Sequence, residues 1–186
     1  RIPRIALVDF NNDSIEDTLR VLDAMFAKYR ELTDAGQRDE AEKYKLYGVR
    51  LDTSGSLRDV SVPPLGDPSL DLGVNPRLVF NVRSALDSAW ERWSLPGSWK
   101  EAAQEYCRNV KIVVSGGFNP EKIRRFEKLS VPADIYAVGS YLFNNNGSTV
   151  TDFTSDVVRV KVHGEWIDMA KVGRRVGENP NLERVW

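Results

Sequence analysis

The stretch Val110-Lys111-Ile112-Val113-Val114-Ser115-Gly116-Gly117 decides the fold class of this 186-residue chain. Its first five residues are rich in β-branched side chains, and the run ends abruptly in a serine and two glycines, as a strand buried in a sheet does. Asn119-Pro120 follows and predicts the start of a helix, because asparagine caps helices and proline suits the first helical position. A strand, a glycine-rich turn and a helix in this order indicate a βαβ unit and therefore a parallel sheet.

Three more short apolar strands lie along the chain and are separated by helical patterns. They are Ile5–Val8, Leu46–Asp52 and Asp134–Val138. We expect a parallel sheet with right-handed crossovers whose strands are apolar on both faces, as buried parallel strands are. The predicted fold class is α/β: a partial (β/α) barrel of parallel strands, about half of a complete barrel, which takes roughly 250 residues.

Three further helices are expected. One begins at Ser14-Ile15-Glu16-Asp17, which resembles a capping box and opens an apolar stripe at helical spacing. A second begins at Asn75-Pro76 and ends before Pro96-Gly97, and a third begins at the capping box Ser98-Trp99-Lys100-Glu101. The segment 61–76 carries four prolines and two glycines, so we expect a long loop that is either functional or inserted.

The pattern changes near the carboxyl terminus. Val157–Val162 alternates, His163-Gly164 suits a two-residue turn, and Trp166–Met169 returns, which predicts an antiparallel hairpin. The remaining stretch, Gly173–Trp186, is basic and then irregular and is expected to be a surface tail. The predicted parts of the chain are 1–150, the barrel half, and 151–186, the hairpin and tail.

Composition excludes several classes of function. With 26 Lys+Arg against 27 Asp+Glu, the net charge is −1, and no basic surplus exists for nucleic-acid binding. The apolar runs are far shorter than the ~20 residues of a membrane span and no signal-peptide pattern is seen, so we expect a cytoplasmic protein. A single cysteine, Cys107, rules out an internal disulfide, and with a single histidine, His163, we expect no protein-built metal site.

The candidate site lies at the carboxyl ends of the strands, because ligands of parallel α/β proteins bind on the loops there. Asp9 follows the first strand, and Arg50 and Asp52 end the second on one face, since Leu51 alternates with them. A guanidinium and a carboxylate together can hold an anionic group and a hydroxylated or cationic one. The alternatives are an internal ion pair for Arg50 and Asp52 and a turn cap for Asp9.

Two turns at the same edge have the chemistry of a phosphate cradle. They are Ser115-Gly116-Gly117 and Gly139-Ser140. Glycine lets the backbone approach an anion, free N–H groups near a helix start point at it, and barrel enzymes often build such sites after their last two strands. The alternative for each is ordinary turn chemistry.

The other chemically active side chains are given structural roles. His163 is expected to be a solvated turn residue and Cys107 a structural one. The tryptophans Trp90, Trp93 and Trp99 are expected to pack between helices.

Four segments together resemble the nicotinate phosphoribosyltransferase family. They are Ala6–Asp9, Gly48–Gly55, Ile112–Gly117 with Glu121–Ile123, and Ala137–Leu142. The element Gly-Val-Arg-Leu-Asp-x-Ser-Gly is the most specific, whereas the glycine loops are shared with quinolinate and nicotinamide phosphoribosyltransferases. The hairpin 157–171 also resembles the segment that follows the barrel in that family.

The resemblance implies a type II phosphoribosyltransferase barrel that joins nicotinate to 5-phosphoribosyl-1-pyrophosphate. It implies nicotinate mononucleotide as a product for NAD biosynthesis, with Mg²⁺ and coupled ATP hydrolysis. Arg50 would contact the pyridine or its substituent, while Asp52 and Asp9 would hold the ribose hydroxyls and offset the charge of an oxocarbenium-like transition state. The implied substrate- and phosphate-binding set is Ser54, Gly55, Ser115, Gly116, Gly117, Gly139 and Ser140.

The chain departs from the family pattern in three respects. Where the family has Asp-Ser-Gly-Asp, this chain has Asp52-Thr53-Ser54-Gly55-Ser56, with one extra residue and no second acid. The loop 61–76 resembles an insertion. Family members are also much longer and are phosphorylated on a histidine that His163 does not match.

These departures shape the expected behaviour of the chain. Because it opens on Arg1-Ile2-Pro3 and enters a strand at once, we expect a fragment that requires a missing amino-terminal half. Its partners would be nicotinate and phosphoribosyl pyrophosphate, with no nucleic acid or membrane, in a homo-oligomer. The fragment alone is expected to be inactive and to self-associate. The alternatives are a nicotinamide or quinolinate phosphoribosyltransferase, or a catalytically inert half-barrel that binds phosphate or assists assembly.

Overall fold

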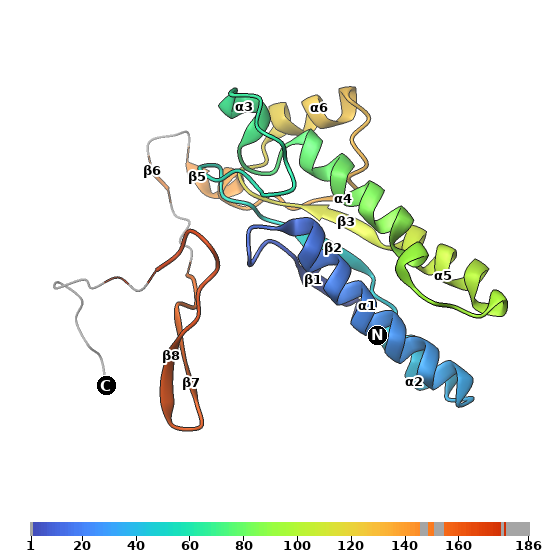
Figure 1. The fold of residues 1–186 in the computed structure, drawn as a ribbon. Helices are drawn as coiled ribbons and strands as arrows, with labels where there is room; N and C mark the ends of the chain where they lie inside the picture. The colour runs from blue at the N-terminus through green and yellow to red at the C-terminus, as the bar shows by residue number, and fades with distance from the viewer. Residues whose placement is uncertain (1, 146–148, 151–154, 176, 178–186) are drawn as a thin grey trace.

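The computed structural model describes residues 2–145, 149–150, 155–175 and 177, and a parallel sheet of four strands lies at its centre (Figure 1). The strands lie side by side in chain order: β1 (Ile5–Leu7), β2 (Gly48–Leu51), β3 (Lys111–Val114) and β4 (Ile135–Tyr136). Leu7, Arg50, Val113 and Ile135 are register neighbours across all four strands. The four parallel strands expected from the sequence are confirmed.

Helices fill each crossover between consecutive strands. Between β1 and β2 lie α1 (Ser14–Asp34), α2 (Arg38–Ala41) and the 3₁₀ turn η1 (Glu42–Tyr44). Between β2 and β3 lie α3 (Pro68–Asp71), α4 (Pro76–Ser88), η2 (Ala89–Arg92) and α5 (Gly97–Asn109), and α6 (Pro120–Lys128) joins β3 to β4. The described strand order never reverses, as it does in a doubly wound sheet, so right-handed crossovers bring the helices to one face.

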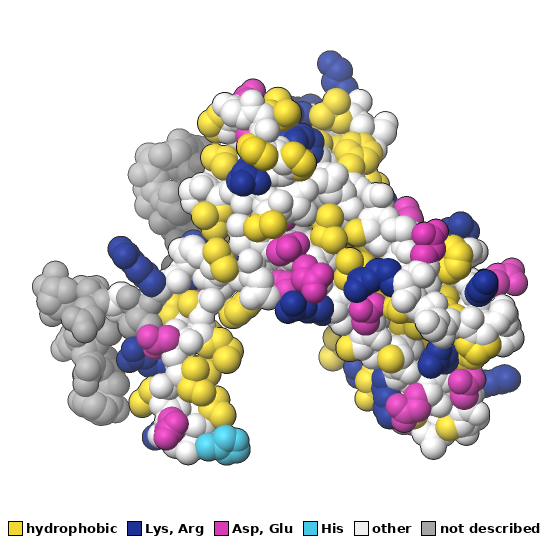
Figure 2. Space-filling model, in the orientation of Figure 1, with side chains coloured by type: hydrophobic (Ala, Val, Ile, Leu, Met, Phe, Trp, Pro, Cys, Tyr) yellow, Lys and Arg dark blue, Asp and Glu magenta, His cyan; other side chains and the backbone are white. Residues whose placement is uncertain are grey.

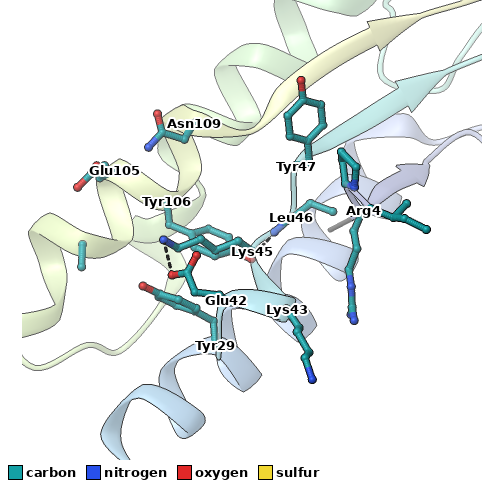
Figure 3. Close-up of a pocket in the computed structure, with 13 residues that line it drawn as sticks. Arg4, Tyr29, Glu42, Lys43, Lys45, Leu46, Tyr47, Glu105, Tyr106 and Asn109 are labelled. Carbon is teal, nitrogen blue, oxygen red and sulfur yellow. Dashed lines mark hydrogen bonds and ion pairs between the residues drawn. The ribbon is translucent and has the colours of Figure 1, made fainter. Parts of the chain in front are cut away.

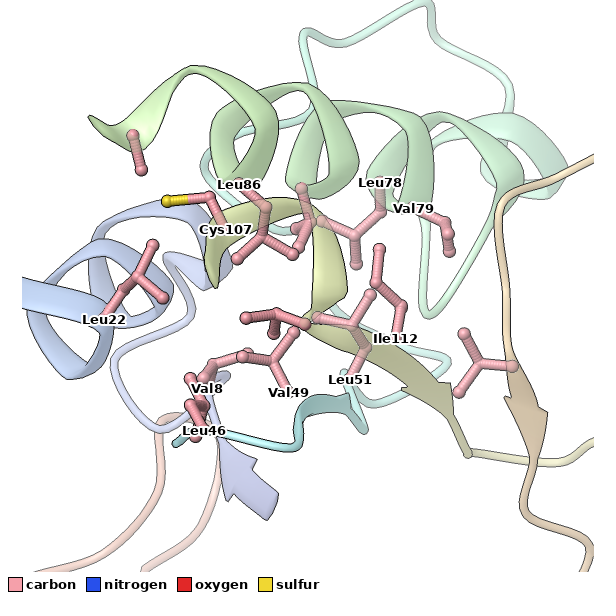
Figure 4. Packing of buried hydrophobic residues seen from close by; sticks show 14 of the residues in the cluster. Val8, Leu22, Leu46, Val49, Leu51, Leu78, Val79, Leu86, Cys107 and Ile112 are labelled. Atoms are coloured by element: carbon pink, nitrogen blue, oxygen red, sulfur yellow. The ribbon is translucent and has the colours of Figure 1, made fainter. Parts of the chain in front are cut away.

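The core lies between the sheet and the helices that cover it (Figure 4). Val49 and Leu51 of β2 face the helices with no exposed surface, and Ile112 and Val114 do the same from β3. The helices supply buried residues at helical spacing, which is the origin of the apolar stripes in the sequence. These residues are Leu22 and Phe26 of α1, Leu78, Val79, Val82 and Leu86 of α4, and Ala103 and Cys107 of α5.

The opposite face of the sheet, which we call the open face, is only partly covered by the described residues. The expectation of strands buried on both faces holds for β3, whose Val113 is 5% exposed on this face, and is wrong for the two outer strands. Ile5 and Leu7 of β1 are 46% and 47% exposed, and Ile135 of β4 is 36% exposed. The cause is topological, because an unreversed strand order recruits every crossover helix to one side. Parallel sheets normally have both faces covered, which makes this open face the most unusual feature of the fold.

The helix starts at Asn-Pro pairs are confirmed, and those at the two serines are wrong. The side chains of Asn75 and Asn119 accept hydrogen bonds from the N–H groups of Leu78 and Lys122, and a proline follows each. In α1, however, Asp13 is the cap and Ser14 is the first helical residue. In α5 the cap position is Pro96, which makes no side-chain cap, and Ser98 lies inside the helix.

Aromatic side chains join α1 to the segment around α5, as expected for the tryptophans. The rings of Phe26 and Trp93 are stacked with centroids 4.1 Å apart. Trp99 meets Phe26 edge-on at 6.0 Å, and Trp93 Nε1 donates to Asp23 Oδ1 at 2.6 Å. Aromatic pairs of this geometry stabilise the contact between the helices beyond what the burial of apolar area contributes.

Two buried aspartates order the long loop between β2 and α4. Asp59 accepts hydrogen bonds from the N–H and hydroxyl groups of both Ser14 and Ser61, at 2.6–3.1 Å. Asp71 accepts from the N–H groups of Leu65 and Gly66 and from Arg77 Nη1 at 2.8 Å. Loop 61–76 is therefore tied to α1 and α4.

Short antiparallel pairs follow the sheet. They are β5 (Asn144–Asn145) with β6 (Thr149–Val150), after the turn η3 (Ser140–Phe143), and β7 (Arg159–Val162) with β8 (Glu165–Asp168). The second pair is the expected hairpin, with His163 and Gly164 at its turn. It stands apart from the helices in Figure 1. Of the expected tail, only residues 173–175 and 177 are described, and no helix among the described residues is long and apolar enough to cross a membrane.

Candidate functional site

The carboxyl ends of β1 to β4 point to one side of the molecule, the side on which the hairpin lies (left in Figure 1). Of the residues predicted to form a site, Arg50 lies within β2 beside its last residue, and the others follow the strand ends. In Figure 2 the surface is hollowed between the hairpin and the body of the protein, and acidic and basic side chains meet at the upper margin of this hollow.

Arg50, Asp52 and Ser115 form a hydrogen-bonded cluster at the ends of β2 and β3. Arg50 Nε donates to Ser115 Oγ at 3.0 Å and Arg50 Nη2 donates to Asp52 Oδ2 at 3.1 Å. Ser115 Oγ also lies 2.7 Å from Asp52 Oδ1 and 2.9 Å from the Leu51 carbonyl oxygen, either of which can accept its proton. The ion pair between Arg50 and Asp52, which was the alternative to a ligand site, is therefore present, and it belongs to a larger hydrogen-bonded cluster.

The Arg50 guanidinium remains accessible although it is paired. Its side chain is 45% exposed and lies on the open face of the sheet, and that of Asp52 is 31% exposed. An exposed ion pair of this kind adds only about 0–1 kcal/mol to stability, so it can open to a ligand at little cost. Ser115 is buried, and its hydrogen bonds hold the side chains of Arg50 and Asp52 in position.

Asp9 lies at the end of β1 with a fully buried side chain, and it is paired with a residue from the far end of the chain. Lys171 Nζ forms an ion pair with Asp9 Oδ2 and donates to the Asp52 carbonyl oxygen at 2.8 Å. Burial raises the pKa of Asp9 above its usual value of 3.8, while the neighbouring Lys171 lowers it and the charge of Asp52 raises it. Lys171 thus links the β1 and β2 ends of the site.

Gly116 and Gly117 both adopt positive φ angles, +89° and +65°, so the backbone of the loop after β3 requires glycine at these positions. A Cβ on Gly116 would lie 3.6 Å from Asp52 Oδ1, which places this glycine beside the cluster. From the first turn of α6, Lys122 Nζ donates to the Gly116 carbonyl oxygen at 3.0 Å and lies 4.3 Å from the Phe118 ring centroid. Burial and the charge of Arg125 lower the pKa of Lys122.

The other predicted residues lie at the same edge but outside this cluster. Gly139 and Ser140 follow β4, and the Gly139 carbonyl accepts from the N–H of Leu142 at 2.8 Å. Ser54 Oγ lies 3.1 Å from Ser56 Oγ, and the Gly55 Cα lies 3.1 Å from where a Cβ on Gly73 would be. Ser54 and Gly55 therefore face the long loop rather than Ser115.

Lys171 and Lys122 are the two site residues that the sequence prediction missed. Lys122 carries a recognisable signal, since it lies in the first turn of the helix that follows the glycine loop. Lys171 carries none, because it is separated from Asp52 by 119 positions and lies after a hairpin that the sequence pattern sets apart from the sheet.

A pocket of about 880 Å³ lies at the opposite, amino ends of β1 and β2 (Figure 3). Tyr29, Leu46 and Tyr106 form its wall, and Arg4 and Lys43 lie at its margin. None of the predicted site residues lines it. The amino ends of barrel strands usually serve stability rather than catalysis, and we assign no ligand to this pocket.

The remaining candidates follow the structural roles expected for them. His163 is exposed at the hairpin turn with φ +49°, and Cys107 is buried in the core, where burial raises its thiol pKa to about 11. Within the described part of the chain, no three His, Cys, Asp or Glu side chains gather as metal ligands would.

Comparisons with protein-family models, with curated proteins and with solved structures give no match to this chain. Fold and site together therefore define an architecture: a singly wound mixed α/β protein with a cluster of carboxylates, cations and glycines at the carboxyl ends of its strands.

Proposed function

We propose that this chain is part of a nicotinate phosphoribosyltransferase and supplies the carboxyl-terminal half of its barrel. In this proposal the carboxyl edge of the sheet binds 5-phosphoribosyl-1-pyrophosphate and transfers its ribosyl group to nicotinate, giving nicotinate mononucleotide and pyrophosphate. The observation that carries the proposal is the cluster of Arg50, Asp52, Ser115 and Gly116, in which hydrogen bonds of 2.7–3.1 Å join side chains from two strands.

The chemistry of the cluster suits a ribosyl transfer that proceeds through positive charge on the sugar. Asp52 offers carboxylate oxygens that can accept from ribose hydroxyls and stabilise a cationic ring. Asp9 is buried and paired with Lys171, so the expected contact of Asp9 with the ribose is not supported, and Asp9 lies behind Asp52 instead. Gly116 and Gly117 leave room for a phosphate beside Lys122, which supplies a cation. Charged side chains that are already held in position lower the barrier to ribosyl transfer, and no covalent intermediate with the protein is needed.

The open face of the sheet supports the barrel part of the proposal. Leu7 and Ile135 are partly exposed at positions that face the interior in a closed barrel, and four strands in unreversed order match half of one. Further strands from outside the described residues would cover this face and complete the pocket above Arg50.

Magnesium and ATP enter this proposal from the resemblance alone. Mg²⁺ commonly binds through one or two carboxylates together with substrate phosphates rather than in an all-protein cage. Asp52, whose side chain is 31% exposed, is the carboxylate that could contribute to such a site.

Isothermal titration with 5-phosphoribosyl-1-pyrophosphate and MgCl₂ tests the donor site directly. We expect the chain to bind the donor. Arg50→Met should weaken that binding at least tenfold, or about 1.4 kcal/mol, because Arg50 holds in place the Asp52 carboxylate that accepts from the ribose hydroxyls. Arg20→Met is the matched control, because Arg20 is exposed on α1 and pairs only with Glu16 among its described contacts. Equal affinities in the two variants, or no binding by the unaltered chain, would contradict the proposed donor site.

Turnover assays separate the possible pyridine substrates. Product mass would be followed with nicotinate, nicotinamide and quinolinate in turn, and we expect only nicotinate to be consumed once the barrel is complete. The 186 residues alone should give no mononucleotide with any of the three, because the open face leaves the base site unwalled.

A second candidate, an inert phosphate-binding half-barrel, is favoured by one observation. At the position where the resemblance calls for a second acid, the loop carries Ser56, whose hydroxyl lies 3.1 Å from Ser54 Oγ. Donor binding without turnover in the completed protein would favour this candidate.

A further inference from the structure

A short segment after the hairpin lies across the carboxyl ends of β1 and β2. We call residues 170–173 the strap. The N–H of Val172 donates to the Phe10 carbonyl oxygen at 2.9 Å, and a Cβ on Gly173 would lie 2.7 Å from Leu57 Cδ1. The strap therefore contacts the loops that follow both strands.

Lys171 is the member of the strap that enters the site. Its side chain is only 14% exposed, and its ammonium is bound by Asp9 and by the Asp52 carbonyl oxygen. An ammonium has three N–H donors, so one remains for a third acceptor after these two contacts. The strap thus brings a cation to the edge where two of the predicted carboxylates lie.

Asp9 depends on this cation more than on any other described group. Its side chain has no exposed surface, and its oxygens accept no hydrogen bond of good geometry from the described residues, which leaves the ion pair with Lys171 as their compensation. Among the described residues, two charged groups face Asp9: Lys171 from the strap and Asp52 from the end of β2, which is itself paired with Arg50. A buried carboxylate without a partner cation becomes protonated instead of remaining charged.

We propose that Lys171 is a positioning residue of the site, which keeps Asp9 ionised and holds the end of β1 against the end of β2. The carboxyl-terminal part of the chain then completes the site at the strand ends. The effect on catalysis rests on the proposed function, whereas the effect on the charge of Asp9 does not.

The charge of Asp9 can be measured without any enzyme assay. The carboxyl carbon of Asp9 would be titrated by ¹³C NMR in the unaltered chain, in Lys171→Met and in Lys171→Arg. We expect the titration midpoint of Asp9 to rise by at least one pH unit in Lys171→Met and to stay near its original value in Lys171→Arg. Lys161→Met is the matched control, because Lys161 lies on the exposed hairpin and contacts the Trp166 ring.

Unfolding experiments give a second readout, which is the pH dependence of the stability loss. A role of Lys171 in packing alone would not produce such a dependence. At high pH the Lys171→Met variant must bury a carboxylate that has no partner cation, whereas at low pH Asp9 is protonated in both proteins. The loss of stability in Lys171→Met should therefore be largest near pH 8 and become small toward pH 4. Asp9→Asn/Lys171→Met removes both charges and should abolish the part of the pH dependence that Asp9 contributes, which keeps the test available if the single variant folds poorly. An unchanged Asp9 midpoint, or a loss of stability equal at every pH, would overturn the proposal.

Chemical restoration of the ammonium isolates its role further. In Lys171→Cys, aminoethylation creates a side chain of lysine length, and Cys107 is spared because it is fully buried with a pKa raised to about 11. We expect the aminoethylated protein to regain the Asp9 midpoint of the unaltered chain, and an unchanged high midpoint after labelling would count against the proposal.

In the completed enzyme, Lys171→Met should lower kcat more than it raises KM, with an altered pH profile. Failure of the proposed function would remove only this last result.

Discussion

Gly116 and Gly139 both lie in loops that follow strands of the sheet, but the backbone conformation requires glycine at only one of these two positions. Gly116 has φ +89°, a conformation that side chains rarely adopt, whereas Gly139 has an ordinary φ and open space where a Cβ would lie. We expect Gly116→Ala to lower the free energy of unfolding by about 1–2 kcal/mol. Chemical denaturation would measure this loss.

Gly139→Ala is the matched control for that substitution. Its effect on stability should lie within about 0.5 kcal/mol, as for a surface change without strain. If donor binding is nevertheless lost in Gly139→Ala, the cause is close approach of a ligand and not folding. Equal stability losses in the two variants would contradict the assigned difference in backbone strain.

Tyr106 is the buried hydroxyl with the clearest pH signature. Its hydroxyl donates to the Tyr44 carbonyl at 2.6 Å and accepts from the N–H of Leu46 at 3.1 Å, and burial raises its pKa to about 12. Because the folded pKa exceeds the unfolded value of 10, the native state retains its proton longer and stability falls between about pH 10 and 12. The expected loss is about 2–3 kcal/mol, from 1.36 kcal/mol per pKa unit.

Tyr106→Phe provides the comparison for this titration. It should cost about 1–3 kcal/mol at pH 8, because the N–H of Leu46 loses its acceptor. The difference in unfolding free energy between the two proteins should then shrink as the pH rises to 12. Urea denaturation at each pH would measure it. A constant difference across this range would show that Tyr106 does not titrate as argued.

At the residue scale, the sequence predicts those site members that lie next to a strand end. Arg50, Asp52 and Ser115 could be found because alternation and strand order place them at one edge. Lys171 could not, since it lies 119 residues from Asp52 and its position depends on how the hairpin before it folds back. Long-range contacts of this kind leave no periodic signal in the chain.

Asp59 joins two elements, the start of α1 and the loop before α4. It has no exposed surface and binds Ser14 and Ser61 through four hydrogen bonds. We expect Asp59→Ala to destabilise the protein by about 3 kcal/mol, because several buried donors lose a charged acceptor. Asp67→Ala is the control, since Asp67 is exposed and caps only the short helix α3. It should cost about 1 kcal/mol or less, and equal losses in the two variants would contradict the linking role of Asp59.

The same contact explains why one helix start was predicted wrongly. The capping-box pattern places Ser14 at the cap, but its hydroxyl donates to Asp59 at 2.6 Å, and Asp13 caps the helix instead. Local sequence does predict Asn75 and Asn119, whose caps depend only on the adjacent turn. Element starts are therefore predictable where the cap is satisfied locally and not where a distant side chain competes.

For the whole molecule, the sequence determines strand order and helix placement but not what covers the second face of the sheet. Apolar residues on both sides of β1 and β3 suggest burial on both faces, and only the structure reveals that Ile5 and Leu7 are left about half exposed. A hydrophobic pattern records that a side chain is suited to burial, and it does not identify which chain segment buries it.

The open face should make the isolated chain self-associate, and this can be tested without disturbing the core. Ile5→Thr/Leu7→Gln replaces two side chains that are 46% and 47% exposed, so the free energy of unfolding should change by less than about 1 kcal/mol. Sedimentation velocity should show the unaltered chain associating with rising concentration and the variant remaining closer to monomer, because apolar contact area is lost. Val8→Gln is the contrasting change, since Val8 has no exposed surface and its loss should unfold the protein. A chain that is monomeric at every concentration, with or without the two substitutions, would show that this face needs no cover and would weaken the half-barrel proposal.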